Sequence, residues 1–119
     1  MEDFNIKEST KDKVRIVYLE GFLDAHTSPI LENALNKLID RKSFNIVVNF
    51  KDLSYISSAG LGVFMAFIEQ ARENGGDIKL CEMSSKIFNI FDMLGFPLLF
   101  EIYDSETKAI EKFNSEIIG

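Results

Sequence analysis

Two adjacent hydroxyl side chains, Ser57 and Ser58, stand where an apolar segment changes its periodicity from that of a strand to that of a helix. They belong to the run YISSAGLGVF, which extends from Tyr55 to Phe64 and contains two glycines just after the serines. A serine at such a corner can cap the helix, act as a nucleophile, help to bind a phosphate or accept a phosphoryl group. The surrounding residues discriminate among these roles.

Helix capping accounts for only one of the two serines. A serine at the N-cap accepts a hydrogen bond from an unpaired backbone N–H and contributes about 1 kcal/mol. Gly60 and Gly62 are poor residues for a first helical turn, because each glycine costs about 0.5–1 kcal/mol relative to alanine. The glycines on either side of Leu61 therefore indicate that something approaches the backbone of residues 60–62 closely.

Nucleophilic catalysis by Ser58 would need a base, and His26 is the only histidine in the chain. Asp24, two residues before His26, would have to orient the imidazole. The corner also lacks the G-x-S-x-G pattern of the hydrolase nucleophile elbow. An Asp-x-His sequence after a strand is more typical of a turn with a solvated imidazole, so a small esterase is the least favoured class.

Phosphate binding lacks its sequence signature, whereas phosphorylation of the serine agrees with the local physics. The run AGLG does not fit G-x-x-x-x-G-K-[ST], and the G-x-G-x-x-G spacing fails after Gly62. A helix N-terminus offers free N–H groups and the positive end of the helix dipole, so it tolerates a phosphate. The added charge, about −1.5 to −2, would repel a docked partner.

The helix predicted after the serines is apolar over an unusually wide arc. At roughly 100° per residue, the apolar arc spans about 200°, which is twice the width that a surface helix needs. Its centre consists of Gly60, Phe64, Phe67, Ile68 and Ala71, and Val63 and Met65 lie at its flanks. These two flanking side chains are candidate partner contacts beside Ser58, although a more deeply buried helix explains the same pattern.

Strand-like and helix-like segments alternate along the chain, which predicts an α/β protein with a mostly parallel sheet. Strands are expected in DFNIKE, KVRIVYLEG, FNIVVNF, DIKLCEM and PLLFEIY. Four helices are expected, in SPILENALNKLID, in residues 58–74, in SSKIFNIFDML and in DSETKAIEKFNSEII. Ser28 is the expected cap of the first helix, and the third has Ser84 or Ser85 as its cap and Gly95 as its end. The last helix places Ile110, Phe113 and Ile117 on one face. Neighbouring strands would bring GFLDAHTSP close to KDLSYISSAGLG, because functional groups gather beyond the carboxyl ends of such strands.

Composition narrows the class of protein. The chain has 119 residues, 46% of them hydrophobic and 27% charged, which predicts one globular domain over residues 1–119. Its net charge of −6 disfavours nucleic acid and anionic membrane surfaces as partners, since both attract clustered Lys and Arg. The single cysteine, Cys81, excludes an internal disulfide and a multi-thiolate metal site. Without a signal peptide or a run of about 18 apolar residues, we expect a cytoplasmic protein with no cofactor or metal.

The run VVNFKDLSYISSAGLGVFMAFIEQARENGGDIKLCEMSSKIFNIFDMLGF, together with the upstream GFLDAHTSPIL, strongly resembles the STAS domain of bacterial anti-sigma factor antagonists. The resemblance covers nearly the whole chain. Its most specific element is a D-S-[STA]-G-L-G corner that follows a strand and a D-x-S-x-[ILM] turn, and DLSYISSAGLG matches it except at one position.

This resemblance implies a four-to-five-stranded mixed sheet with about four helices, built from successive strand–helix units. It also implies a protein that is not an enzyme. The unmodified form would bind an anti-sigma factor that is also a serine kinase with a histidine-kinase-like ATPase fold, and this binding would release a sigma factor. Phosphorylation of Ser58 would end the interaction, and a PP2C-type phosphatase would restore it. The family's acidic residue at the end of the second strand corresponds to Asp24.

Position 57 departs from the family pattern, because an aspartate usually precedes the phosphoacceptor and Ser57 stands here. The change removes a carboxylate and adds a second hydroxyl, so Ser57 is the alternative acceptor. A second possible function is that of a STAS interaction subunit in a larger assembly that works without phosphorylation. A transporter-associated STAS domain is disfavoured because no membrane segment is present. The oligomeric state and the identities of the sigma factor, kinase and phosphatase stay open.

Overall fold

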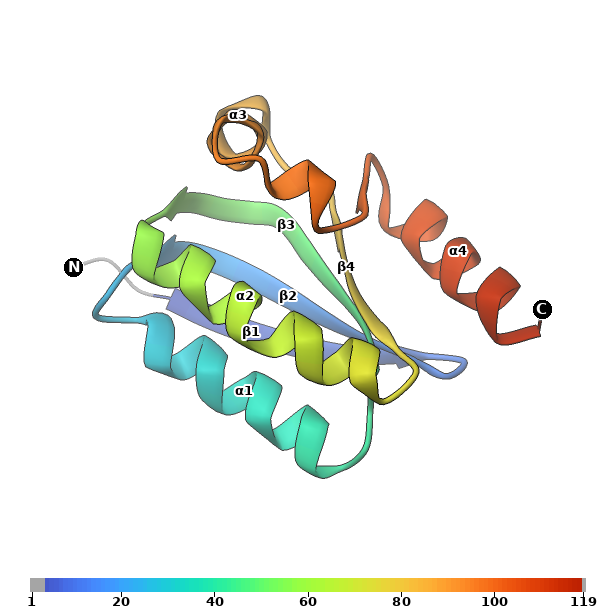
Figure 1. Ribbon diagram of the computed structural model, residues 1–119. Helices are drawn as coiled ribbons and strands as arrows, with labels where there is room; N and C mark the ends of the chain where they lie inside the picture. Colours follow the sequence, from blue (N-terminus) through green and yellow to red (C-terminus); the bar gives the residue numbers. More distant parts are fainter. Residues whose placement is uncertain (1–3, 119) are drawn as a thin grey trace.

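The structure is a computed structural model that describes residues 4–118 (Figure 1). Its elements follow in the order β1 (Phe4–Lys11), β2 (Val14–Leu23), α1 (Ser28–Asp40), β3 (Asn45–Ile56), α2 (Ser58–Glu73), β4 (Asp77–Cys81), α3 (Ser85–Met93), the 3-10 helix η1 (Phe96–Leu98), β5 (Ile102–Tyr103) and α4 (Glu106–Ile118). The predicted α/β class is therefore confirmed, with five strands and four α-helices in the described part of the chain.

The strands form one mixed sheet in the order β1-β2-β3-β4-β5. β1 pairs antiparallel with β2, and the remaining neighbours are parallel. Parallel neighbours need crossover connections, which α1, α2 and α3 provide. This arrangement confirms the predicted mostly parallel sheet and sends the carboxyl ends of β2 and β3 to the same edge.

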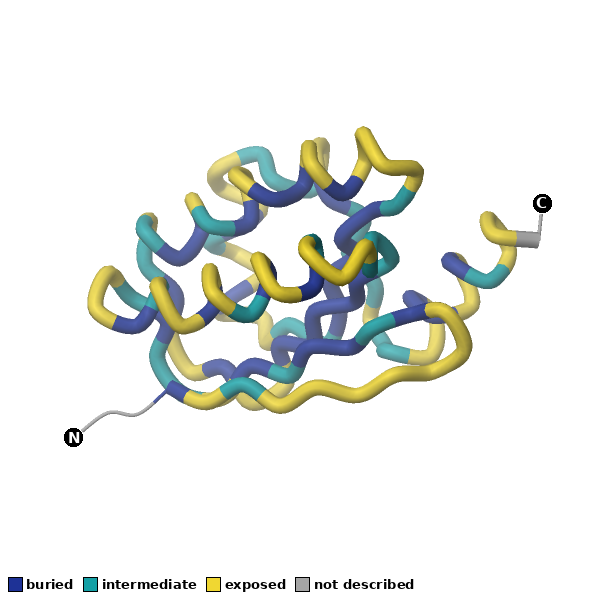
Figure 2. The backbone as a smooth tube through the Cα atoms, turned by 90° about the horizontal axis from the view of Figure 1, so that it is seen from below, coloured by how far each residue is buried: buried dark blue, intermediate teal, exposed yellow. Residues whose placement is uncertain are grey.

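The two faces of the sheet carry separate apolar clusters, because successive side chains of a strand point to opposite faces. One face packs against α1, α2 and α3 and includes Val17, Leu19, Ile46 and Val48. The other face packs against α4 through a smaller cluster of Val14, Ile16, Val47, Cys81, Ala109, Ile110 and Phe113. Figure 2 shows the buried residues gathered where helices and sheet meet. Of the predicted α4 face, Ile110 and Phe113 are buried, while Ile117 is exposed.

β3 is longer than its apolar run predicts. The sequence suggested a strand ending at Phe50 and a loop through residues 51–57, but the strand continues to Ile56. Leu53 and Ile56 are buried, and the polar residues between them face solvent. The prediction was wrong because two register shifts along the β2–β3 pair break the simple alternation of apolar and polar residues.

The predicted last strand, PLLFEIY, was also wrong over most of its length. Gly95 adopts φ 76°, and residues Phe96–Leu98 form η1 instead. Phe96 and Phe100 stack with ring centroids 5.7 Å apart, which holds this turn closed. Only Ile102 and Tyr103 pair with β4, so β5 is a short edge strand. Gly95 does follow the end of α3, as predicted.

The predicted cap of α1 is shifted by one residue. The N-cap is Thr27, and Ser28 is the first helical residue. For α3, the structure selects Ser84 from the two candidates, because its hydroxyl oxygen accepts a 3.2 Å hydrogen bond from the Ile87 N–H. A short polar residue before a helix predicts that a cap exists, but the position of the cap depends on the turn that precedes it.

Candidate functional site

The ends of β2 and β3 join the serine corner to the Asp24 turn. Leu23 pairs with Ile56 in the sheet, and the Ser57 N–H donates a 2.9 Å hydrogen bond to the Leu23 carbonyl. The first residue after β3 is thus tied to the last residue of β2. The two segments predicted to lie close together, GFLDAHTSP and KDLSYISSAGLG, are therefore neighbours at one edge of the sheet.

Ser57 is the N-cap of α2. Its backbone is extended, with φ −101° and ψ 173°, and its hydroxyl oxygen accepts a 3.4 Å hydrogen bond from the Gly60 N–H. Its carbonyl oxygen accepts a 3.0 Å bond from the Leu61 N–H, which begins the helical ladder. Because it is half-buried and engaged in the cap, Ser57 has a structural role at the corner.

Ser58 is the first helical residue of α2, and its side chain is exposed. Within residues 4–118, its hydroxyl has no hydrogen-bond partner. It stands at the helix N-terminus, where backbone N–H groups are free and the helix dipole favours negative charge. Of the two adjacent serines, Ser58 is the one whose hydroxyl is available to another molecule.

Asp24 organises the turn between β2 and α1. Its Oδ1 accepts hydrogen bonds from the backbone N–H of Thr27 at 3.0 Å and from the backbone N–H of His26 at 2.9 Å, and it lies 3.2 Å from the Thr27 hydroxyl oxygen. The backbone hydrogen bond from Thr27 is the main cause that lowers the pKa of the Asp24 carboxyl. Asp24 thus places a stable negative charge on the turn next to the serine corner.

Thr27 was not among the residues that the sequence singled out. Its hydroxyl donates a 2.8 Å bond to the Phe22 carbonyl and accepts a 2.9 Å bond from the Asp24 N–H. These bonds fold the turn back onto the end of β2, and Thr27 is buried. The Asp-x-x-Thr spacing is the signal that points to it, because short polar side chains at that spacing bond to nearby backbone.

His26 does not form a catalytic arrangement with Asp24 and Ser58. The bond from His26 to Asp24 uses the backbone N–H, and the imidazole has no hydrogen-bond partner among the described residues. A serine nucleophile would need the imidazole at its hydroxyl and the carboxylate at the imidazole. The geometry therefore gives no support to the esterase alternative.

The two glycines of the corner have different surroundings. A Cβ at Gly60 would lie 2.7 Å from Leu23 Cγ, so this glycine lets α2 pack against the end of β2. A Cβ at Gly62 would meet nothing within 4 Å, and Gly62 is exposed. Leu61 between them is buried in the main core. The close approach at Gly60 is thus made by the protein's own core, whereas Gly62 leaves the surface open.

The central residues of the α2 apolar arc are buried, but its flanks differ. Gly60, Phe64, Phe67, Ile68 and Ala71 all lie in the core. Val63 is half-buried and packs against that core, while Met65 is 41% exposed. The wide arc is mainly explained by deep burial of the helix, and Met65 is left as an exposed apolar side chain.

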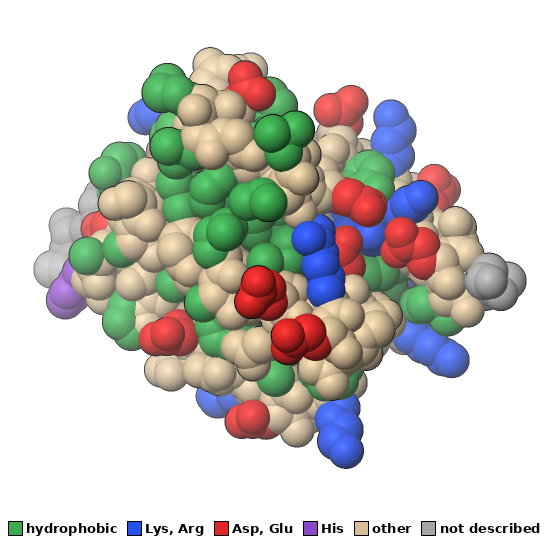
Figure 3. Space-filling view, in the orientation of Figure 1, with side chains coloured by type: hydrophobic (Ala, Val, Ile, Leu, Met, Phe, Trp, Pro, Cys, Tyr) green, Lys and Arg blue, Asp and Glu red, His purple; other side chains and the backbone are tan. Residues whose placement is uncertain are grey.

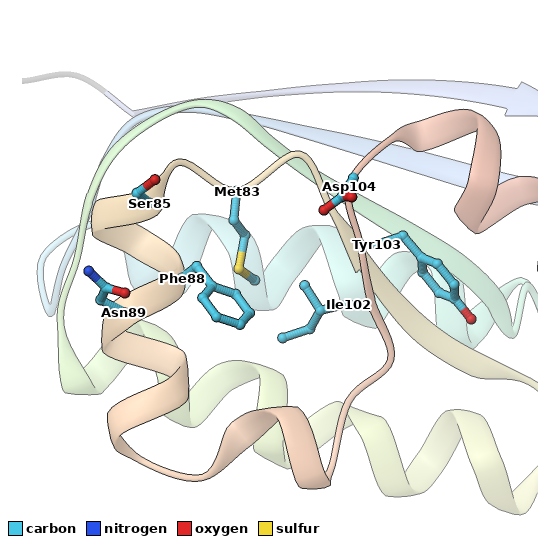
Figure 4. A pocket seen from close by; sticks show the side chains of 7 residues that line it. All are labelled: Met83, Ser85, Phe88, Asn89, Ile102, Tyr103 and Asp104. Atoms are coloured by element: carbon cyan, nitrogen blue, oxygen red, sulfur yellow. The ribbon is translucent and has the colours of Figure 1, made fainter.

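A cavity of about 440 Å³ lies between α3 and β5, on elements other than those of the serine corner (Figure 4). Met83, Phe88 and Ile102 form its apolar side, and Ser85, Asn89 and Asp104 stand around it. Figure 4 shows the Tyr103 ring turned away from the other side chains, and its hydroxyl donates to Glu101. Burial is the main cause that raises the pKa of Tyr103. No charged cluster converges on this cavity.

Two further properties concern metals and membranes. Within residues 4–118, no three side chains among His, Cys, Asp and Glu are grouped so that they could hold a metal ion. Cys81 is buried, and burial raises its thiol pKa to about 12. In the same part of the chain, none of the helices has the length and apolar character needed to cross a bilayer.

The chain is similar in sequence to a known family over most of its length. A family model described as the STAS domain matches residues 5–109. An anti-sigma F factor antagonist of Paenibacillus polymyxa is 33% identical over 98 residues, which are 82% of this chain and 84% of the relative. An anti-sigma-B factor antagonist of Staphylococcus aureus is 30% identical over 100 residues, which are 84% of this chain and 93% of the relative.

Solved structures show the same fold at lower sequence identity. The unphosphorylated form of the anti-sigma factor antagonist SpoIIAA has a TM-score of 0.79 at 21% identity, covering 95% of this chain and 97% of that chain. The phosphorylated form of SpoIIAA from Bacillus has a TM-score of 0.70 at 21% identity, covering 92% and 98%. Together, the matched family model, the sequence relatives and the shared fold identify the chain as a member of the STAS domain family.

Proposed function

We propose that the chain is an anti-sigma factor antagonist whose partner binding is switched off by phosphorylation of Ser58. The observation that carries the proposal is the division of roles at the corner, where Ser57 caps α2 and Ser58 presents a free hydroxyl. The antagonist role is supported by the sequence relatives, which are anti-sigma factor antagonists. A phosphorylation switch is supported by the structural neighbour SpoIIAA, which exists in an unphosphorylated and a phosphorylated form.

The partner is an anti-sigma factor that is also a serine kinase of the histidine-kinase-like ATPase class. In the modification step, Ser58 Oγ attacks the γ-phosphorus of ATP, the bond from that phosphorus to the ADP oxygen breaks, and the hydroxyl proton passes to a base of the kinase. The chain is a substrate and not an enzyme in this step. A PP2C-type phosphatase hydrolyses the phosphoester and returns the hydroxyl. The cycle takes place in the cytoplasm.

The phosphate acts through its charge. At pH 7 it carries about −1.5 to −2 charges, and it would stand at the start of α2 beside the turn that holds the Asp24 carboxylate. The backbone N–H groups of α2 stabilise the phosphate locally. A partner surface that has docked over Ser58 and Met65 would have to desolvate this charge, so binding is lost.

The alternative function is an interaction subunit that binds its partner regardless of phosphorylation. The half-buried, capping Ser57 in place of the family's aspartate keeps this alternative open, because the altered corner could escape the kinase. The two functions make opposite predictions for a Ser58→Asp variant. The antagonist loses partner binding, while the constitutive subunit keeps it.

The experiment uses each histidine-kinase-like ATPase encoded by the source genome, purified and incubated with the chain and ATP. Mass spectrometry then locates the phosphate. We expect phosphorylation on Ser58 in the wild type and in Ser57→Ala, and none in Ser58→Ala. If none of these ATPases binds or modifies the chain, the proposed function is wrong. If one binds the wild type and Ser58→Asp equally, the alternative function is correct.

A further inference from the structure

The end of α3 and the η1 segment carry large apolar side chains that the fold does not bury. Met93 is 82% exposed, Leu98 is 90% exposed, and Leu94 and Leu99 are 56% and 42% exposed. We call these four residues the α3–η1 surface. Figure 3 shows this side of the molecule, where hydrophobic side chains gather over α3 and the segment that follows it. Large apolar side chains that gather in the open on one surface are typical of interaction sites.

The α3–η1 surface rests on a well-anchored segment. The Phe96 ring packs edge-to-face on Phe91 at 5.3 Å and stacks on Phe100 at 5.7 Å. The Phe100 N–H also donates a 2.9 Å bond to the Phe96 carbonyl. Because the aromatic rings hold the turn from within, Leu98 is directed to solvent and does not contribute to the core. Its apolar character is therefore not required by the fold.

One side of α2 connects this surface with Ser58. Ser58, Met65 and Arg72 are spaced by seven residues, so they lie on the same side of the helix. Arg72 Nη2 donates a 2.6 Å bond to the Leu99 carbonyl, which places that side of α2 against the α3–η1 surface. At 1.5 Å per residue, Ser58 and Arg72 are about 21 Å apart along the helix. A protein interface of standard size, about 800 Å² on each partner, is wide enough to cover both.

Exposed acidic side chains lie near the α3–η1 surface, either next to it in the sequence or on α2. Asp92 precedes Met93, and Glu69 and Glu73 stand before and after Arg72 along α2. None of the three forms an ion pair with another described residue, while Arg72 is already paired with Asp77 at 2.8 Å. Figure 3 shows acidic side chains (red) on both sides of the hydrophobic side chains (green) that gather over α3 and the segment after it. Lys86, the nearest other cation along α3, is two turns before Met93.

We propose that the α3–η1 surface is a second part of the partner interface, and that it takes a partner segment with large apolar side chains flanked by lysine or arginine. The apolar residues would cover Leu98 and Met93, and the basic residues would face Asp92, Glu69 and Glu73. The statement that the same partner also contacts Ser58 rests on the proposed function. The apolar and basic character of the partner segment is inferred from the α3–η1 surface alone.

A second copy of this chain is a less suitable occupant. Self-association through the α3–η1 surface would bring the acidic side chains of two copies together, and the whole chain carries a net charge of −6. Like charges facing each other across an interface oppose association. A positively charged partner segment meets no such opposition.

The first arm of the test uses two fluorescent model helices, each with leucines on one face, flanked by lysines in one peptide and by glutamates in the other. We expect the lysine peptide to bind the full chain at least about tenfold more tightly than the glutamate peptide. A Met93→Ser/Leu98→Ser variant should bind it about tenfold more weakly. The matched control is Ile117→Ser on α4, where the side chain is 39% exposed, and it should bind normally. Circular dichroism checks that each variant is folded. If the double variant does not fold, the single variant Leu98→Ser replaces it in the binding measurement.

The second arm measures binding of the same variants to the anti-sigma factor kinase found by the phosphorylation experiment. We expect a loss of about tenfold for the α3–η1 variant and none for Ile117→Ser. Equal binding of the two model helices, or normal kinase binding by Met93→Ser/Leu98→Ser, overturns the inference. Sedimentation showing a wild-type dimer that Leu98→Ser dissociates overturns it as well. If no kinase binds the wild type, the proposed function is wrong. The comparison of the two model helices then still tests whether the α3–η1 surface binds a basic apolar segment.

Discussion

The backbone N–H of Ser57 donates a 2.9 Å hydrogen bond to the carbonyl of Leu23, so the last residue of β2 directly supports the first residue after β3. The same Leu23 side chain occupies the space where a Cβ of Gly60 would stand. The serine corner is therefore positioned by the core from two sides. These contacts fix the place of the exposed Ser58 at the surface.

Replacing Gly60 and Gly62 by alanine should have opposite effects on stability. Gly60→Ala places a Cβ 2.7 Å from Leu23 Cγ, and such overpacking costs about 1–3 kcal/mol. Gly62→Ala meets nothing within 4 Å and should stabilise the protein by about 0.5–1 kcal/mol, because alanine favours a helix. Urea denaturation measures both changes. Equal effects of the two substitutions would contradict the different surroundings assigned to these glycines.

Removal of the α2 cap should lower stability without removing the phosphoacceptor. Ser57→Ala loses the hydrogen bond with the Gly60 N–H, and because that bond is 3.4 Å long we expect a cost near the lower end of the usual range, about 0.5 kcal/mol. Ser58→Ala is the matched control, since its hydroxyl has no partner within the described residues, and it should leave the urea midpoint unchanged. A larger loss for Ser58→Ala than for Ser57→Ala would reverse the roles given to the two serines.

The Asp24 turn should depend on the oxygen of its side chain. Asp24→Asn can still accept the backbone bonds from His26 and Thr27 through its amide oxygen, while Asp24→Ala cannot. We expect faster hydrogen exchange at the Thr27 amide in the alanine variant only. Since the folded-state pKa of Asp24 lies below 3.8, its charge-dependent stabilisation is present above that pH and is lost as the pH falls through the lowered pKa. Unchanged exchange in Asp24→Ala would exclude the organising role.

Buried Lys79 should determine how stability changes with pH. Its ammonium group pairs with Asp77, Glu101 and Glu116 at 3.0, 2.9 and 3.1 Å. Burial opposes the charge on Lys79, but hydrogen bonds with Glu101 and Asp77 outweigh it and raise the pKa. Burial also opposes the charge on Glu101, while bonds from Tyr103 and Lys79 outweigh it and lower the pKa.

The sign of the pH effect follows from these two directions. The Glu101 contribution is present above its ordinary value of 4.5 and is lost as the pH falls through the lowered pKa. The Lys79 contribution is present below its ordinary value of 10.5 and is lost as the pH rises through the raised pKa. Lys79→Met should destabilise the protein at pH 7 by less than the about 3–5 kcal/mol typical of a fully buried pair, because Asp77 keeps Arg72 as a partner and Glu101 and Glu116 reach solvent. Urea denaturation at several pH values should show this cost shrinking at both extremes, and a cost independent of pH would contradict the assignment.

Local patterns predicted the α/β class and the serine corner, because alternation, helical spacing and small polar residues are visible within a few positions. Features set by contacts distant in the sequence were missed. The extension of β3 to Ile56 depends on its pairing with Leu23, and the need for a glycine at position 60 depends on the Leu23 side chain. Leu98 and Leu99 suggested a strand, yet the stacking of Phe96 on Phe100 closes a turn there.

The most direct test of the central claim is the affinity of the purified anti-sigma factor kinase for the wild type, for Ser58→Asp and for enzymatically phosphorylated chain, measured by isothermal titration calorimetry. Ser58→Ala is the control that removes the hydroxyl without adding charge. We predict that the wild type and Ser58→Ala bind equally, and that the negative charge at position 58 weakens binding at least about tenfold. Equal binding of the phosphorylated and unphosphorylated chains would contradict the proposed switch.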